Sequence, residues 1–385
     1  MNALGQVSMR LQALLGQLDF AEKALDSEGI DKNLRNRVGH VLRKNIEKER
    51  HDVQAALNRI HHGTTKSAWN SLKIREQQSA TVFHECLAFL QGGRARGRDV
   101  DIKLCEIADG LLDQLSYACG LAWGRFTILA DEEFFSDYAQ IIRIRFPFHG
   151  IWDLPVAAHE FGHFAAHRLT AGEGQARSLP FPQFVTDYCG QNKLGREWVL
   201  YLNEFFADAF ATYTLGPSYA FTSLLLRFGV ATAHDEVDQK HPSYAKRAQL
   251  ILDVLNRMDC EADSKGALDP VIRLLRDLWD TALNSAEMRK QMPDADGERL
   301  GYLTGELYRI LTRTATHARY NRWDMTAQLQ SNVKAGTKAP TCEYEVRDLL
   351  NAAWRARFEP NSSPEQISGR VICLAMRVVR NGAVK

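Results

Sequence analysis

The sequence lacks the features that would place it in several common classes of protein. No apolar run approaches the roughly 18 residues of a membrane helix, and "FTSLLLRFGVATA" is short and interrupted by Arg227. The start, "MNALGQVSMRLQALLGQLDFAEK", has neither a basic first region nor an uninterrupted apolar core, so we expect no signal peptide. The seven cysteines are odd in number and scattered, which favours reduced thiols. We therefore expect a soluble cytoplasmic protein that does not associate with a membrane.

Charge and known motifs exclude little more. The net charge is only +1, which gives no indication of a nucleic-acid partner. We find no internal repeat, no phosphate-binding P-loop and no Ser-His-Asp signature. The 385 residues, of which 45% are hydrophobic, are enough for two or three domains with apolar cores.

One short stretch, "VAAHEFGHFAAH", carries a pattern with defined chemistry. His159 and His163 are four residues apart, which places both imidazoles on one face of a helix, within reach of a single zinc ion. Glu160 lies about 100° further round the helix, where a general base can contact water at the ion. Because His-Glu-x-x-His arises by chance in roughly one chain in fifty of this length, the pattern needs support from elsewhere. The alternative is a helix with surface histidines.

A catalytic zinc ion normally has three protein ligands, so a third donor is required. His167 repeats the four-residue spacing, but it lies about 6 Å along the axis from His163, too far to share the ion on a straight helix. We interpret His167 as a residue of the helix face or of the surroundings of the ligands. In "WVLYLNEFFADAFATYTLGPSYA", Glu204 and Asp208 interrupt an apolar run four residues apart.

Buried carboxylates are costly unless they are paired or bind a metal ion. Glu204 is therefore the predicted third ligand, and Asp208 can accept the free ring N–H of a ligand histidine. The alternative is that both acids emerge at the helix surface.

These residues together resemble the gluzincin class of zinc peptidases, over a stretch from Val156 to Pro217. In that class two histidines of one helix and a glutamate of a second helix bind zinc, and an aspartate follows the glutamate by four residues. The resemblance implies a metal-dependent peptide-bond hydrolase, with Glu160 as general base, zinc as Lewis acid and Asp208 next to a ligand.

A second similarity lies at "HPSYAKR". Several gluzincins, including the CAAX-prenyl-endopeptidase type, carry a His-Pro segment and a nearby arginine after the glutamate helix. This implies that His241 or Tyr244 donates a hydrogen bond to the oxyanion and that Arg247 holds the local structure. Equally, Pro242 is a residue that starts a helix. The absence of transmembrane helices argues against a prenylated substrate.

The residues before the zinc helix have the alternation of a strand. Ile142, Ile144 and Phe146 alternate with Arg143 and Arg145. We expect an edge strand beside the zinc helix, to which an extended substrate adds and whose arginines favour acidic side chains. The alternative is an ordinary edge strand, whose arginines prevent it from pairing with strands of other chains.

The remaining sequence is predicted to be helical. Apolar stripes before about residue 60 indicate two long antiparallel helices in the first hundred residues, and "DMTAQLQSNVKAGTKAPTCEYE" is predicted to be a flexible loop. The predicted fold is mainly α, with a zincin core in which a small sheet lies beside the zinc and glutamate helices. The regions expected are an N-terminal helical region (1–99), the catalytic core (100–257) and a C-terminal helical region (258–385).

The predicted function is cleavage of an intracellular protein or peptide by a Zn²⁺-dependent endopeptidase. Because such a peptidase must be restrained, we expect the N-terminal helices to cover the cleft or to recognise a regulatory protein partner. The alternative is a catalytically inactive zincin-fold protein that regulates or binds through its helical arms. A hydrolase of a non-peptide substrate is a third hypothesis.

Overall fold

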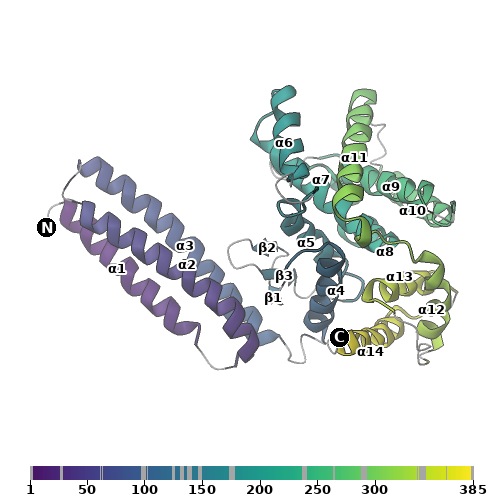
Figure 1. Cartoon of the computed structure of the whole chain (residues 1–385), viewed down its shortest axis with the longest axis horizontal. Helices are drawn as coiled ribbons and strands as arrows, with labels where there is room; N and C mark the ends of the chain where they lie inside the picture. Colours follow the sequence, from purple (N-terminus) through teal and green to yellow (C-terminus); the bar gives the residue numbers. More distant parts are fainter. Residues whose placement is uncertain are drawn as a thin grey trace. The chain divides into compact units, whose positions relative to one another are not determined.

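The protein is mainly helical, as the sequence predicts (Figure 1). The computed structural model describes residues 3–26, 29–60, 62, 64–96, 101, 103–123, 126–130, 134–136, 141–145, 150–172, 178–235, 241–262, 265–287, 293–335, 337, 344–360 and 362–382. The chain divides into two compact units, of which unit 1 is Met1–Cys105 with Arg125–Phe146 and unit 2 is Glu106–Gly124 with Pro147–Lys385. No helix in the described ranges has both the length and the apolar character needed to cross a membrane.

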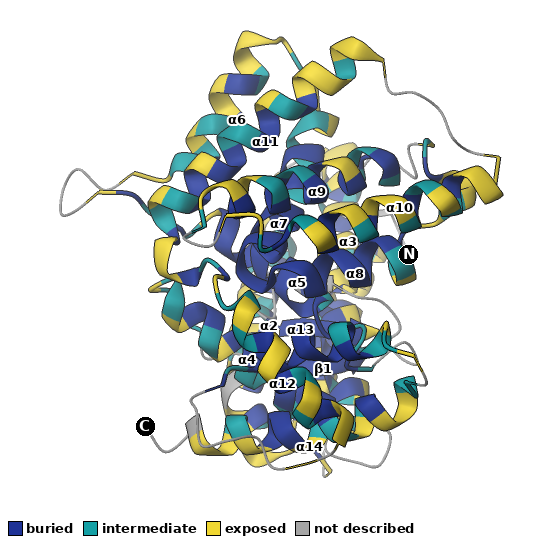
Figure 2. Cartoon of the chain, turned by 90° about the vertical axis from the view of Figure 1, so that its right-hand side faces the viewer, coloured by how far each residue is buried: buried dark blue, intermediate teal, exposed yellow. Residues whose placement is uncertain are grey.

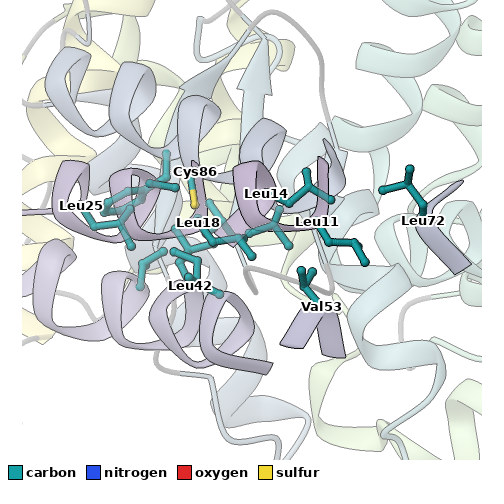
Figure 3. Close-up of a cluster of buried hydrophobic side chains, with 14 of the residues drawn as sticks. Leu11, Leu14, Leu18, Leu25, Leu42, Val53, Leu72 and Cys86 are labelled. Atoms are coloured by element: carbon teal, nitrogen blue, oxygen red, sulfur yellow. The ribbon is translucent and has the colours of Figure 1, made fainter. Parts of the chain in front are cut away.

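Unit 1 contains a bundle of three helices where the sequence predicted two. The predicted stripes lie on α1 (Ala3–Ala24) and α2 (Lys32–Arg59), and α3 (Thr65–Ala95) packs against both. Figure 3 shows apolar side chains of all three helices in one cluster. The hydroxyl of Thr64 accepts a hydrogen bond from the Ser67 N–H (3.2 Å), so Thr64 caps the N-terminus of α3. Helical structure was expected throughout the first hundred residues, but α3 was not recognised as a separate helix, because its buried face includes Ser79, Glu85 and two glycines, which weaken the apolar period.

The expected edge strand is instead the central strand of a small sheet. Among the described strands, β3 (Ile141–Arg145) lies between β1 (Thr127–Ala130), which it pairs with in parallel, and β2 (Phe134–Ser136), which it pairs with antiparallel. Both of its edges are therefore engaged, and the prediction that a substrate strand adds to it was wrong. Arg143 is buried and forms an ion pair with Glu85 of α3 (3.0 Å). Its guanidinium thus already pairs with a carboxylate of the protein itself.

Unit 2 is built around two buried helices, α5 (Val156–Ala166) and α7 (Arg196–Leu215). Figure 2 shows most of α5 and the C-terminal part of α7 in the colour of buried residues. The other elements of this unit are α6 (Pro180–Gln191), α8 (Pro217–Thr222), the π-helix η3 (Ser223–Arg227), the 3-10 helix η4 (Val230–Thr232), α9 (Tyr244–Cys260), α10 (Asp269–Ser285), α11 (Asp294–Thr314), the 3-10 helix η5 (Thr316–Ala318), α12 (Trp323–Ala335), α13 (Val346–Arg357) and α14 (Pro364–Gly382). Most of α4 (Leu104–Ala118) also belongs to it.

The C-terminal helices are part of the same unit as α5 and α7, whereas the sequence suggested a separate region from 258. The Asn351 side chain of α13 donates a hydrogen bond to the Leu215 carbonyl (2.7 Å) and accepts one from the Ser218 N–H (2.9 Å). These bonds satisfy backbone groups where α7 ends and α8 begins. The division also places Arg125–Phe146 with the N-terminal helices, outside the unit of α5 and α7.

Part of the predicted flexible loop in the C-terminal half is helical. Its first half belongs to α12, and residues 336 and 338–343 lie outside the described part. Leu329 and Val333 are fully buried, four residues apart on one face of α12. Their burial against α13 stabilises a helix whose polar sequence gave little indication of one.

Candidate metal centre

The candidate centre lies where α5 and α7 cross at close range. A Cβ added to Gly162 would lie 2.8 Å from the Ala207 Cα and 3.2 Å from the Ala207 carbonyl oxygen, so only glycine permits this approach. Gly162 directly precedes His163, and Ala207 directly precedes Asp208. The crossing therefore positions the polar residues of both helices against one another inside an otherwise apolar core.

The structure brings Glu204 of α7 between the two histidines of α5. Its Oε2 lies 3.4 Å from His159 Nε2, and its Oε1 lies 3.4 Å from His163 Nε2. Two ligands, each about 2.0–2.1 Å from a tetrahedral ion, are separated by roughly 3.3–3.4 Å. Ordinary N–H···O hydrogen bonds are shorter, at about 2.7–3.2 Å. The spacing of the three side chains therefore fits ligands around one ion better than direct hydrogen bonds.

Glu160 joins the same group from the α5 side. One ligand atom each of His159, Glu160 and His163 lie within 4.8 Å of one another, and Glu160 is buried at 8% exposure. The three atoms of that group do not include Glu204, but the Glu204 carboxylate is the one that faces both Nε2 atoms. The Glu204 carboxylate thus faces both histidine rings, and Glu160 lies close to the same two histidines.

The other ring nitrogen of His159 faces a buried polar cluster. His159 Nδ1 lies 3.0 Å from Asp208 Oδ1 and 3.0 Å from the hydroxyl of Tyr219. Arg247 of α9 donates from Nε to Asp208 Oδ2 (2.7 Å) and from Nη2 to Asp208 Oδ1 (2.8 Å). In the neutral imidazole, a proton on Nδ1 leaves the lone pair on Nε2, which is the tautomer that a metal ligand needs.

Charge in the cluster is balanced by pairing. Burial opposes ionisation of Asp208, but Arg247 outweighs it and lowers the Asp208 pKa to about 2. Glu204 is largely shielded from solvent, yet His159, Arg247 and His163 hold its pKa well below the ordinary value. Both acids are thus carboxylates, and Arg247 Nη1 lies 3.5 Å from Glu204 Oε2, close to both.

The histidines differ in their affinity for a proton. Burial lowers the pKa of His159, but Asp208 and Glu204 outweigh it and raise the pKa to about 10. Burial lowers the pKa of His163 to about 4. The carboxylates thus stabilise a positive charge at His159, while His163 offers a free lone pair. Two imidazoles and one carboxylate are the donor types found in a class of catalytic zinc sites.

The remaining predicted residues lie at different places. His241 Nε2 lies 3.6 Å from Glu204 Oε1, and its side chain is 39% exposed, so it borders the ligand group on a solvent-accessible side. Tyr244, in the first turn of α9, stacks on Phe228 with the ring centroids 5.0 Å apart. Arg247 lies over the same Phe228 ring, 5.1 Å from its centroid. Pro242 precedes α9, which begins at Tyr244.

His167 ends α5 rather than extending it. It is the exposed C-cap residue, and its ring lies 6.2 Å from that of Phe181. Its surroundings are therefore the end of the helix and an aromatic ring of α6.

Sequence reasoning missed Tyr219. It is one of several tyrosines in an apolar run, and α7 ends at Leu215, between Asp208 and Tyr219, so helical spacing does not relate the two residues. The only signal was the Gly216-Pro217 pair, which predicts a helix end and a new helix start. Comparison with protein-family models, with curated proteins and with solved structures found no match to this chain. The functional inference therefore rests on the residues of the site.

Proposed function

We propose that this chain is a zinc-dependent peptidase of the gluzincin type, with α5 as its zinc helix and α7 as its glutamate helix. The observation that carries the proposal is the Glu204 carboxylate, 3.4 Å from the Nε2 atoms of both His159 and His163. A chance His-Glu-x-x-His helix would have no reason to face a buried carboxylate of a distant helix. Nor would a merely structural site need Glu160 beside its ligands.

The proposed roles follow from position. His159, His163 and Glu204 hold the ion, and Asp208 and Arg247 hold the ring of His159. A zinc ion bound there supplies Lewis acidity to a carbonyl group and to water. Glu160 would take a proton from the attacking water at its carboxylate and return it to the leaving amine. Because Glu160 is buried, bulk solvent does not compete for that proton.

His241 is the proposed donor to the oxyanion. Its Nε2 borders Glu204 from the accessible side, where the carbonyl of a bound peptide would approach. Tyr244 remains the second candidate for this role, although the contact shown for its ring is with Phe228. A cytoplasmic location, a protein or peptide substrate and a regulatory partner for the N-terminal helices stay predictions.

Replacement of Glu160 by glutamine tests the proposal. The Glu160→Gln protein should keep stoichiometric zinc and lose cleavage by about 10²–10⁴-fold, because its amide cannot accept the proton. Glu197→Gln is the matched control, since Glu197 is an exposed glutamate in the first turn of α7. Zinc is measured by elemental analysis, and cleavage by mapping new protein N-termini in cells with each variant.

The outcome separates the two leading hypotheses. A wild-type protein that lacks stoichiometric metal would contradict the whole proposal. Bound metal with no new N-termini, together with unchanged cellular function of the Glu160→Gln protein, would favour the inactive regulatory protein that acts through its helical arms.

A further inference from the structure

Tyr219 contacts the candidate centre from a helix that carries none of the predicted ligands. It lies in α8, is 2% exposed, and places its hydroxyl 3.0 Å from His159 Nδ1 and 2.5 Å from Asp208 Oδ1. Its ring stacks almost parallel to the imidazole, with an interplanar angle of 10° and centroids 6.1 Å apart. The hydroxyl thus meets both the histidine and its carboxylate partner.

The turn between α7 and α8 makes this contact possible. Gly216 has φ 64° and ψ −144°, a conformation that side chains disfavour, and its N–H donates to the Thr212 carbonyl (2.8 Å). A Cβ at this position would lie 2.6 Å from the ring of Tyr320. Pro217 then starts α8, which returns Tyr219 to Asp208. The turn therefore sets where the phenol lies.

The phenol completes the hydrogen bonding of a buried carboxylate. Asp208 is fully buried, and its Oδ1 accepts from Arg247 Nη2 and from the Tyr219 hydroxyl, with His159 Nδ1 at 3.0 Å. A hydroxyl in an apolar core is costly without partners, so packing alone would favour phenylalanine at this position. The groups that orient the ligand histidine are thus also the partners that satisfy this hydroxyl.

From this geometry we infer that Tyr219 is a positioning residue of the metal centre, which holds the His159 ring and the proton on its Nδ1 together with Asp208. The inference rests on the proposed metal site. With the phenol in place, the Nδ1 proton has two oxygen acceptors, Asp208 Oδ1 and the tyrosine oxygen. Rotation of the imidazole would break both contacts and the ring stacking, so Nε2 stays directed at Glu204 before any ion binds.

The test is zinc affinity in the full chain, measured by competition with a chromogenic chelator. All proteins carry Glu160→Gln, so the measurement does not depend on turnover. Tyr219→Phe removes one oxygen and should raise the zinc dissociation constant about 10–100-fold, the range typical for loss of a ligand's hydrogen-bond partner. It should also shift the visible absorption bands of the Co²⁺-loaded protein, because His159 is less constrained.

Tyr308→Phe is the matched control. Tyr308 is also buried, and its hydroxyl also donates to a carboxylate, Glu261 Oε2 at 2.9 Å, but between α11 and the end of α9. Its loss should lower the unfolding midpoint of the metal-free protein without changing zinc affinity. If Tyr219→Phe behaves in the same way, Tyr219 is merely structural and the inference is wrong.

Two further outcomes are distinguishable. If the protein with Tyr219 intact binds no zinc, the proposed metal site fails and the inference fails with it. If Tyr219→Phe does not fold, the comparison is made in a Gly301→Ala background, because an added Cβ at Gly301 of α11 meets no heavy atom within 4 Å and alanine favours the helix. Weaker zinc binding by the double variant than by Gly301→Ala alone then supports the role of Tyr219, and equal binding overturns it.

Discussion

Replacing Gly162 with alanine should separate the two helices that carry the proposed metal ligands. The added Cβ would lie 2.8 Å from the Ala207 Cα, whereas carbon atoms in contact are about 3.5–4.0 Å apart. The obstacle is backbone, which cannot move aside as a side chain can. The helices must therefore shift by roughly 1 Å at this point.

The expected effect on metal binding is larger than the effect on stability. A shift of about 1 Å is half the length of a bond of about 2.0–2.1 Å to zinc, so Glu204 and the histidines could no longer share the ion well. We expect zinc affinity to fall by about a hundredfold or more. Overpacking costs about 1–3 kcal/mol, of which about 1 kcal/mol is offset by the better helix propensity of alanine.

Gly301→Ala is the control for this prediction. Gly301 lies within α11 and has no heavy atom within 4 Å of an added Cβ. The substitution should stabilise the protein by up to about 1 kcal/mol and leave zinc affinity unchanged. Affinity is measured by chelator competition and stability by chemical unfolding. Wild-type zinc affinity in Gly162→Ala would refute the idea that this close crossing sets the ligand spacing.

Two further predictions concern buried charges. Arg247→Met should destabilise unit 2 by about 3–5 kcal/mol in chemical unfolding, because it leaves Asp208 buried without its counter-charge. Adding Asp208→Asn should recover stability but not zinc affinity. If stability is not recovered, the pairing of Arg247 with Asp208 is contradicted. In unit 1, burial raises the pKa of Glu49 more than Arg75 and Ser79 lower it. The folded chain therefore binds the Glu49 proton more tightly than the unfolded chain does. The stability of the fold should fall as the pH rises from the ordinary pKa of glutamate through the raised pKa. Hydrogen exchange of α2 should show this loss of stability with pH in the wild type and in Glu47→Gln, an exposed control on the same helix, but not in Glu49→Gln. An identical pH profile in all three proteins would exclude Glu49 as the source of the pH dependence.

Local spacing explains which parts of the site could be predicted. The separation of His159 from His163 and that of Glu204 from Asp208 are both one helical turn, and each pair interrupts an apolar helix. Carboxylates inside such a run need partners, so the spacing and the apolar neighbours are enough to indicate both acids as site residues. The structure places these four side chains together.

Pairings between distant segments could not be predicted in the same way. The alternation of Ile142 with Arg143 indicated a strand, but its neighbours depend on strands elsewhere in the chain, and β3 proved to be central. Arg143 seemed a surface residue by its type alone, until Glu85 of α3 supplied a buried partner. Residues 324–335 similarly became helical through packing of their few apolar side chains against α13.

The sequence by itself thus determined the residue types of the candidate centre and their order along two helices, because helical spacing is a property of neighbouring residues. Only the tertiary structure decided how closely α5 and α7 approach, through the missing side chain of Gly162. It alone returned Tyr219 to His159, through a backbone conformation that Gly216 permits. Both features depend on contacts between segments far apart in the chain. The spacing of neighbouring residues does not reveal such contacts.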